Sequence, residues 1–278
     1  MGSEHDKMLL KFWGVRGSIP TPTLQNMGNG GNTTCLEVRL PSGEVLIVDG
    51  GTGVRSLGAS LAAEAQGKAS DLHIFLTHFH WDHIHGLPYF QPLYSKENSV
   101  TFYSMMTPEE TCEILEGQMH GPYFPWDFRL LPAQRNFVAI TGKTFRFGET
   151  EVNNFALNHP QGCHGYSFTH RGRKLVFASD LEHGVPEFDR ILLDAAHGAD
   201  LLIFDAQYTP DEYRDRRGWG HSTWLQATEV AKQTGSKKLL LFHHDPGHTD
   251  EAMQAILAEA RTHFAETYLA IEGESFTI

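Results

Sequence analysis

Residues 72–83 read Leu72-His73-Ile74-Phe75-Leu76-Thr77-His78-Phe79-His80-Trp81-Asp82-His83, an apolar run followed at once by three histidines and an aspartate within six positions. The apolar part is typical of a buried strand. Imidazole nitrogens and a carboxylate oxygen at a strand end are donors that suit a borderline divalent ion such as zinc. His78 and His80 are two residues apart and can point to one side, whereas Asp82 and His83 are better placed for a second ion. The segment therefore predicts a metal site.

The strand and turn Val48-Asp49-Gly50-Gly51-Thr52-Gly53 precede this H-x-H-x-D-H run, and together they resemble the metallo-β-lactamase superfamily. Members supply one further histidine, one bridging aspartate and a last histidine, each at a strand end. The candidates here are His159, Asp180 and His243. The resemblance implies an α/β (α+β) fold, the four-layer αββα sandwich. It also implies ligands divided between two ions that Asp180 bridges: His78, His80 and His159 on one, and Asp82, His83 and His243 on the other.

Within the superfamily, the segment from Asp205 to His243 most resembles ribonuclease Z and its phosphodiesterase relatives. His243 lies 22 positions after His221, which is the spacing in that group and selects His243 over His244. The resemblance implies that His221 acts as general acid, a role imidazole can fill near neutral pH, and that Asp205 orients it. Taken alone, a histidine before Ser222 and Thr223 could equally belong to a helix cap.

Length and composition predict one enzyme domain. The chain has 278 residues, 40% of them hydrophobic, and we expect a single metallo-hydrolase domain over residues 8–278. We expect residues 1–7 to be unstructured or left over from cloning, and residues 87–150, where the likeness is weakest, to form a variable substrate-pocket region. Without a run of 18 apolar residues or an apolar leader, we expect a cytoplasmic protein with no membrane contact. The three cysteines lack C-x-x-C spacing, which favours small, buried, unpaired residues: Cys35, Cys112 and Cys163.

Charge and aromatic residues suggest the substrate class. The formal net charge of −12 disfavours a long polynucleotide, because proteins that hold one usually carry a basic face. Arg216 and Arg217 could contact a small phosphate, although such clusters are usually solvated. Tyr123 and Phe124 could stack on a nucleobase, although aromatic rings more often pack in cores. The flexible arm with which ribonuclease Z grips tRNA has no Gly-rich or basic counterpart here. We therefore expect a small phosphodiester substrate, no extended nucleic-acid surface and, as an open alternative to a monomer, a homodimer.

The predicted reaction uses two divalent ions. Zinc suits the imidazole donors best, and manganese or iron also fits a His/Asp set. Two such ions would share a water and lower its pKa, giving a bridging hydroxide that attacks phosphorus. Asp82 could accept that water's proton as well as bind metal. The predicted function is a dinuclear metal-dependent phosphodiesterase for a small diester, preferably a cyclic nucleotide. The alternatives are an RNA 3′-end processing endonuclease of the ribonuclease Z type, a thioester or lactam hydrolase, and a metal-storing or regulatory protein without turnover.

Hydrophobic periodicity predicts alternating strands and helices. The expected helices cover residues 54–65, 108–117, 223–233 and 251–264. The expected strands cover residues 8–12, 35–40, 45–49, 72–76, 137–140, 152–157, 174–178, 201–204 and 239–242, with a hairpin-like ending over residues 271–278.

Overall fold

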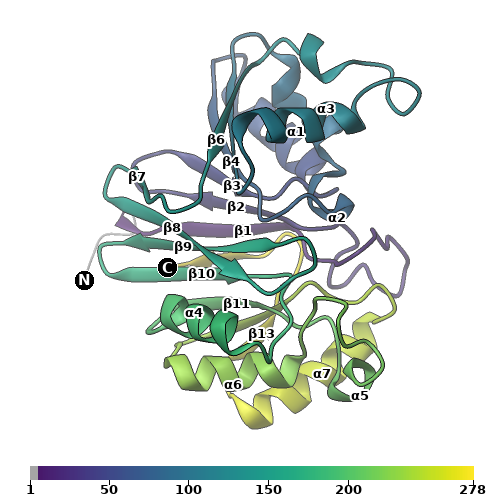
Figure 1. Ribbon diagram of the computed structural model, residues 1–278, viewed down its shortest axis with the longest axis vertical. Helices are drawn as coiled ribbons and strands as arrows, with labels where there is room; N and C mark the ends of the chain where they lie inside the picture. The colour runs from purple at the N-terminus through teal and green to yellow at the C-terminus, as the bar shows by residue number, and fades with distance from the viewer. Residues whose placement is uncertain (1–5) are drawn as a thin grey trace.

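The computed structural model describes residues 6–278 and contains two seven-stranded mixed β-sheets packed face to face, with helices on both outer faces (Figure 1). This arrangement confirms the predicted four-layer αββα sandwich. Of the N-terminal segment expected to be unstructured, residues 1–5 lie outside the described part, and Asp6 forms an ion pair with Arg171.

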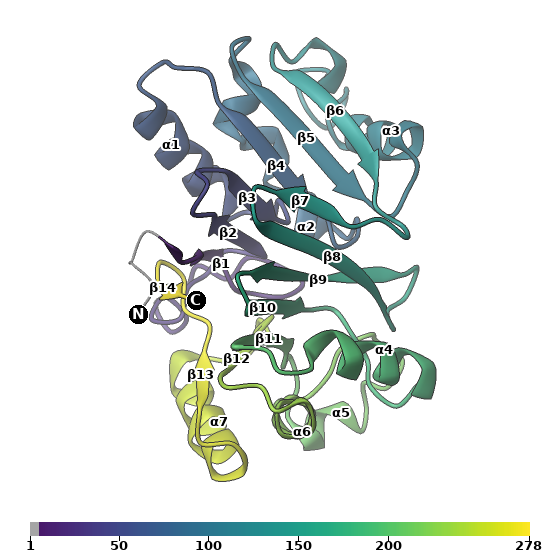
Figure 2. The same ribbon diagram turned by 90° about the vertical axis from the view of Figure 1, so that its left-hand side faces the viewer.

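The first sheet has the strand order β14-β1-β2-β3-β4-β5-β6, and its strands β4, β5 and β6 lie toward the top of Figure 2. Its pairs are antiparallel from β14 to β3 and parallel from β3 to β6. The strands are β1 (Leu9–Gly14), β2 (Cys35–Arg39), β3 (Val45–Val48), β4 (Asp71–Phe75), β5 (Ser99–Ser104), β6 (Gln134–Ala139) and β14 (Ser275–Thr277).

The second sheet repeats this plan with the order β13-β12-β11-β10-β9-β8-β7. It is antiparallel from β7 to β10 and parallel from β10 to β13. The strands are β7 (Phe145–Phe147), β8 (Thr150–Leu157), β9 (Cys163–His170), β10 (Arg173–Ala178), β11 (Leu201–Asp205), β12 (Leu239–Phe242) and β13 (Thr267–Leu269).

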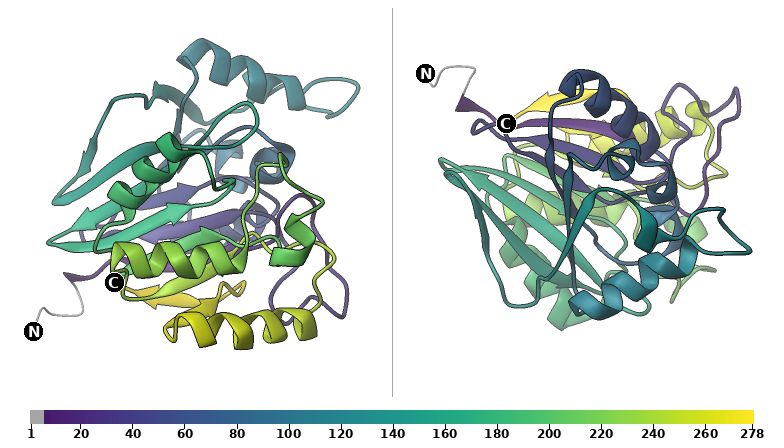
Figure 3. Two further views of the ribbon diagram at one scale, coloured as in Figure 1. Left: turned by 60° about the horizontal axis from the view of Figure 1, so that its bottom comes forward. Right: turned by 90° about the horizontal axis from the view of Figure 1, so that it is seen from above.

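Three hydrophobic layers hold the sandwich together. The middle layer lies between the sheets, where Phe12 and Phe75 share a cluster with Phe177 and Phe242. Helices α1 (Val54–Ala65) and α3 (Pro108–Gln118) pack on the first sheet, and α4 (Pro186–Ala196), α6 (Trp224–Thr234) and α7 (Asp250–His263) pack on the second. Figure 3 shows α6 and α7 side by side along that outer face. Burial of these apolar faces is the main force that orders the four layers.

Local signals explain where the helices begin and end. Thr107 caps α3 with a capping box completed by Glu110, and Thr223 caps α6 by accepting a hydrogen bond from the Gln226 N–H. Gly235 ends α6 in the left-handed conformation that glycine favours. The remaining helical turns are short: α2 (Trp81–Ile84), η2 (Leu87–Tyr89), η3 (Gln91–Tyr94), η4 (Phe128–Leu130) and α5 (Pro210–Tyr213).

Most expected elements are present, and the differences have physical causes. The ending expected as a hairpin is wrong, because β13 pairs with β12 of the second sheet and β14 pairs with β1 of the first. The expected elements also omit β5, β9 and α4, whose apolar residues are interrupted by polar ones, and β7 and β13, which are only three residues long. Cys35 and Cys163 are buried as expected, whereas Cys112 is partly exposed. Within residues 6–278, no helix combines the length and apolar character needed to cross a membrane.

Candidate active site

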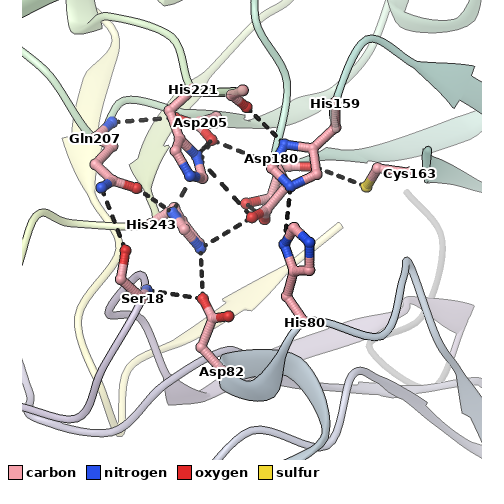
Figure 4. Close-up of polar contacts among 12 residues, drawn as sticks. Ser18, His80, Asp82, His159, Cys163, Asp180, Asp205, Gln207, His221 and His243 are labelled. Carbon is pink, nitrogen blue, oxygen red and sulfur yellow. Dashed lines mark hydrogen bonds and ion pairs between the residues drawn. The ribbon is translucent and has the colours of Figure 1, made fainter. Parts of the chain in front are cut away.

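The candidate site lies at one edge of the sandwich, where the carboxyl ends of strands from both sheets meet. Every residue that the sequence predicted as a metal ligand or proton donor reaches this edge, together with the predicted positioning residue. Several of them are shown in Figure 4. His78 and His80 follow β4, and Asp82 and His83 lie in α2. The ends of three strands of the second sheet are followed by His159 (β8), Asp180 (β10) and His243 (β12). Asp205 is the last residue of β11, and His221 precedes α6.

Backbone geometry at these strand ends is unusual. Asp49, Asp180 and His243 all have φ near +60°, the left-handed region that non-glycine residues rarely adopt. Asp49 and His243 are the first residues after their strands and Asp180 is the second after β10, so the left-handed turn redirects each side chain at a strand end. Unfavourable backbone conformations of this kind persist where surrounding contacts enforce them, and they concentrate at functional sites.

The first group of ligand atoms comes from His78, His80 and His159, each of which offers one ring nitrogen, and these three nitrogens lie within 4.8 Å of one another. His159 Nε2 and His80 Nδ1 are only 3.1 Å apart. The opposite nitrogens are occupied, because His159 donates from Nδ1 to the Gly220 carbonyl (2.8 Å) and His80 donates from Nε2 to Oε1 of Gln161 (2.7 Å). In the neutral tautomers, two lone pairs therefore face each other across the short distance.

The third histidine of this group is oriented in the same way through a relay. The hydroxyl of Thr77 donates to Asp49 Oδ2 (2.9 Å), so its oxygen accepts the Nδ1 proton of His78 at 3.0 Å. This leaves His78 Nε2 facing the site, buried and without a hydrogen-bond partner. A buried nitrogen without a partner is costly unless a ligand satisfies it.

The second group of ligand atoms comes from Asp82, His83, Asp180 and His243, again within 4.8 Å of one another. His83 Nε2 lies 3.3 Å from an oxygen of Asp82 and 3.3 Å from one of Asp180, yet makes no hydrogen bond. His243 Nε2 lies 3.2 Å from both carboxylates. Asp180 also approaches His78 of the first group at 3.9 Å, so this carboxylate stands between the two groups.

These observations fit divalent metal ions. Within each group, one ring nitrogen of every histidine converges on the other ligand atoms, and its other ring nitrogen is held by a protein acceptor, as is usual for metal-bound histidines. For the second group those acceptors are Asp49, which receives the Nδ1 proton of His83 at 2.7 Å, and Gln207, which receives that of His243 at 2.9 Å. The donor types, imidazole and carboxylate, are those that zinc, manganese and iron accept.

The pKa values of the second group also indicate a site for a cation. Burial alone would lower the pKa of His243, but Asp180, Asp82 and Asp205 raise it to about 9. Burial would raise the pKa values of Asp82 and Asp180, yet the imidazoles of His83 and His243 hold them well below the usual range. Such a network carries protons that a divalent cation can replace.

Asp205 and His221 form a separate pair beside the ligands. His221 donates from Nδ1 to Asp205 Oδ2 at 2.8 Å, which leaves Nε2 as the nitrogen free to serve the cleft that His221 lines. Asp205 also accepts hydrogen bonds from the backbone N–H groups of Asp180, Gln207 and Ser222. Because its oxygens are already occupied in this way, Asp205 is suited to hold His221 rather than to bind metal.

The loop before His221 is fixed by Glu182. Its carboxylate accepts hydrogen bonds from Gly218 and Gly220 N–H groups and from the Tyr213 hydroxyl. Gly220 has φ +86°, and a Cβ there would collide with the His159 ring. This glycine therefore permits the close approach that lets its carbonyl orient His159.

The residues predicted to contact substrate lie farther out. Arg216 lies over the Tyr208 ring (5.1 Å) and Arg217 over the Tyr213 ring (5.8 Å), so both guanidinium groups are held on neighbouring aromatic rings. Tyr123 and Phe124 line a hollow next to the cleft rather than the cleft itself. For all four, contact with substrate stays a prediction.

Sequence reasoning left some supporting residues without a role. Asp49 carried a signal, since it lies at a strand end and precedes glycines, and the structure makes it the acceptor that orients His83. Gln161 lies two residues after His159, and Gln207 two after Asp205, but nothing in their local sequence reveals their partners. His244 is buried and donates from Nε2 to the Ala270 carbonyl (2.8 Å), so it points away from the ligands, as the selection of His243 requires.

Two facing sheets flanked by helices, with a His/Asp site at their shared edge, define a protein of the metallo-β-lactamase fold with a candidate metal centre. Solved structures agree on the fold. The metallo-β-lactamase fold protein YhfI from Bacillus subtilis has a TM-score of 0.72 at 20% identity, over 98% of this chain and 100% of YhfI. The short form of human tRNase Z has a TM-score of 0.66 at 20% identity, over 96% and 98% of the two chains.

Sequence comparison identifies the family. The sequence model of the family described as the β-lactamase superfamily domain matches residues 45–244, so the chain belongs to this family. Ribonuclease Z of Lactococcus lactis is 27% identical over 251 aligned residues, covering 70% of this chain and 78% of the relative. Ribonuclease Z of Pyrococcus horikoshii is 25% identical over 292 residues, covering 86% of each chain. The resemblance to the ribonuclease Z group predicted from the sequence is confirmed.

Proposed function

We propose that this protein hydrolyses a phosphodiester bond with the help of two divalent metal ions. The observation that carries the proposal is the Asp205–His221 pair beside two groups of ligand atoms. Departure of an alkoxide from phosphorus requires a proton, and an imidazole held by a carboxylate can supply it. Thioester or lactam hydrolysis uses the same ligands but has no special need of this pair. A metal-storage protein has no need of it either.

The proposed ligands are those predicted from the sequence. His78, His80 and His159 hold one ion, Asp82, His83 and His243 the other, and Asp180 reaches both. Zinc is the first choice because imidazoles dominate the donors, with manganese or iron as alternatives. When bound, the ions would polarise the phosphoryl oxygens and lower the pKa of a bound water to near neutrality.

Each remaining step belongs to a residue of this chain. Asp205 accepts the Nδ1 proton of His221 and so turns Nε2 toward the cleft; His221 acts in its imidazolium form, donates the Nε2 proton to the leaving oxygen and keeps the Nδ1 proton on Asp205. Asp82 accepts a hydrogen bond from the backbone N–H of Ser18 at 2.7 Å, which orients its carboxylate. In the proposed reaction, this carboxylate takes the proton of the attacking water. Buried hydrogen bonds fix these groups before substrate arrives, so little reorganisation accompanies the reaction.

For the substrate, the relatives favour RNA: the curated proteins named above are ribonucleases Z, and the alignments cover most of each. A small diester such as a cyclic nucleotide is the second candidate. Its support is the formal net charge of −12, which opposes binding of a long polyanion. The two candidate substrates predict a different salt dependence of binding affinity, because only a polynucleotide releases many counterions when it binds.

The test is hydrolysis by protein loaded with zinc or manganese. An activated aryl phosphodiester reports the chemistry, and a 3′-extended tRNA precursor is compared with 3′,5′- and 2′,3′-cyclic AMP to identify the substrate. Cleavage of the precursor supports the ribonuclease Z type, and turnover of a cyclic nucleotide alone supports the small-diester alternative. If the metal-loaded protein cleaves none of these diesters, the proposal is wrong.

A further inference from the structure

An aromatic hollow adjoins the cleft and is not used by the chemistry described above. It has a volume of about 570 Å³ and lies between α2, η2, the end of α3 and the loop that follows α3. Six aromatic rings line it: Phe79, Trp81, His85, Tyr89, Tyr123 and Phe124.

The hollow and the catalytic cleft share a wall. Phe79 and Trp81 line both cavities, and the cleft also contains His80, Asp82 and His221. Trp81 stands between two proposed ligands in the sequence and begins α2. The helix buries Asp82 and His83 toward the site while leaving Trp81 on its outer side. A group bound against Trp81 therefore lies next to the place where a phosphate would react.

The rings of the hollow are exposed where a folded chain would normally bury them. Trp81 is 77% exposed and Tyr123 is 76% exposed. Trp81 stacks with His85, one helical turn along, with ring centres 6.2 Å apart and planes inclined by 29°. On the other wall, Tyr89 meets Phe124 edge to face at 5.6 Å. Exposed rings gathered in a concave surface beside an active site indicate a ligand-binding site.

The chemistry of the lining selects a planar, weakly polar group rather than a phosphate. Among the described residues that line the hollow there is no lysine or arginine. The Gln118 side chain donates to the Ile84 carbonyl at 3.2 Å, which fixes the amide and turns its oxygen into an oriented acceptor. An oriented amide among rings suits a nucleobase, whose faces stack and whose edge carries N–H groups.

We propose that this hollow binds the nucleobase of the nucleotide that adjoins the scissile phosphate, with Trp81 and Tyr123 as its main stacking surfaces. The inference rests on the proposed phosphodiesterase function and adds a specificity-determining subsite to it. A volume of about 570 Å³ is of the size of small-molecule sites and admits one nucleoside, not a base-paired duplex. The base is therefore single-stranded or part of a small molecule.

The test measures binding separately from turnover. Isothermal titration calorimetry compares adenosine 5′-monophosphate with ribose 5-phosphate on the zinc-loaded protein, since the two differ only in the base. We expect the nucleotide to bind at least about tenfold more tightly, in keeping with one stacked base. Trp81→Ala and Tyr123→Ala each remove an exposed ring, so the fold should survive. The matched control is Trp126→Ala, whose ring is also exposed but contacts Tyr94 outside the hollow.

A preference for the nucleotide that Trp81→Ala and Tyr123→Ala reduce, and that Trp126→Ala retains, supports the subsite. Equal affinity for the two ligands, or a preference that neither hollow variant changes, overturns it. Turnover of diesters is assayed on the same samples. A ring-dependent preference in a protein that cleaves no diester would support the base subsite and reject the proposed function, so the two failures are distinguishable.

Discussion

The cleft and the aromatic hollow share Phe79 and Trp81 but are built on opposite principles. In the cleft, each of five histidines has one ring nitrogen fixed by a protein acceptor and the other turned inward. In the hollow, the two most exposed rings touch few neighbours and remain free to meet a ligand. Buried, hydrogen-bonded groups suit a reaction that needs fixed geometry, whereas exposed rings suit selection among substrates. Mutations in the two regions should therefore have different signatures.

The largest effect is expected from Asp180→Asn, which removes the carboxylate charge that both ligand groups share. Turnover of every diester should fall below detection, with or without a base on the substrate, and metal analysis should show fewer bound ions. Asp194→Asn on the exposed side of α4 is the matched control and should retain both. Near-normal metal content and activity in Asp180→Asn would contradict the ligand assignment.

His221→Ala should separate proton donation from metal binding. For a diester with an alkoxide leaving group, kcat should fall about 10²- to 10⁴-fold, the usual worth of a general acid. With a p-nitrophenolate leaving group the loss should be much smaller, because that group departs without a proton. Bound metal should be unchanged, and His197→Ala, an exposed histidine, serves as control. An equal loss for both leaving groups would rule out the acid role.

A smaller effect is expected from Gln161→Asn, which shortens the side chain that receives the His80 proton. Asparagine tolerates the positive φ of 62° at this position, so the backbone should be preserved. Loss of such a supporting hydrogen bond typically weakens metal affinity about 10- to 100-fold. Competition with a chromophoric chelator measures the affinity, and Gln134→Asn on exposed β6 should match the wild type. Unchanged affinity would mean that Gln161 does not orient His80.

The same contrast explains how much the sequence could predict. The run from His78 to His83 is local, so its donors and the preceding strand are visible in one stretch. His159, Asp180 and His243 could be placed because a family pattern supplies the long-range order. The partners of those ligands could not, since the contacts of Gln161 with His80 and of Gln207 with His243 form only when distant segments fold together. Residues 87–150 illustrate the same limit: the sequence shows the rings of Tyr123 and Phe124, but only the fold places them in one hollow with Trp81.

The smallest expected effect is one of pH, and it contrasts two adjacent histidines. Burial is the largest influence on each, but carboxylates raise the pKa of His243 to about 9, whereas burial lowers that of His244 to about 3. In metal-free protein, the raised pKa of His243 increases the free energy of unfolding. This contribution is fully present below pH 6.5, about the pKa of histidine in the unfolded chain, and is lost as the pH rises toward 9. His244 is neutral in both states over most of that window and contributes no such change.

Urea unfolding of chelator-treated protein at pH 6.5 and pH 9 should therefore show a loss of stability that His243→Gln reduces and His244→Gln leaves in place. Zinc should reverse the trend, since an ion at this site displaces the His243 proton and binds more tightly as the pH rises. A pH effect of equal size in the wild type and His243→Gln would show that the carboxylates do not hold a proton on this histidine.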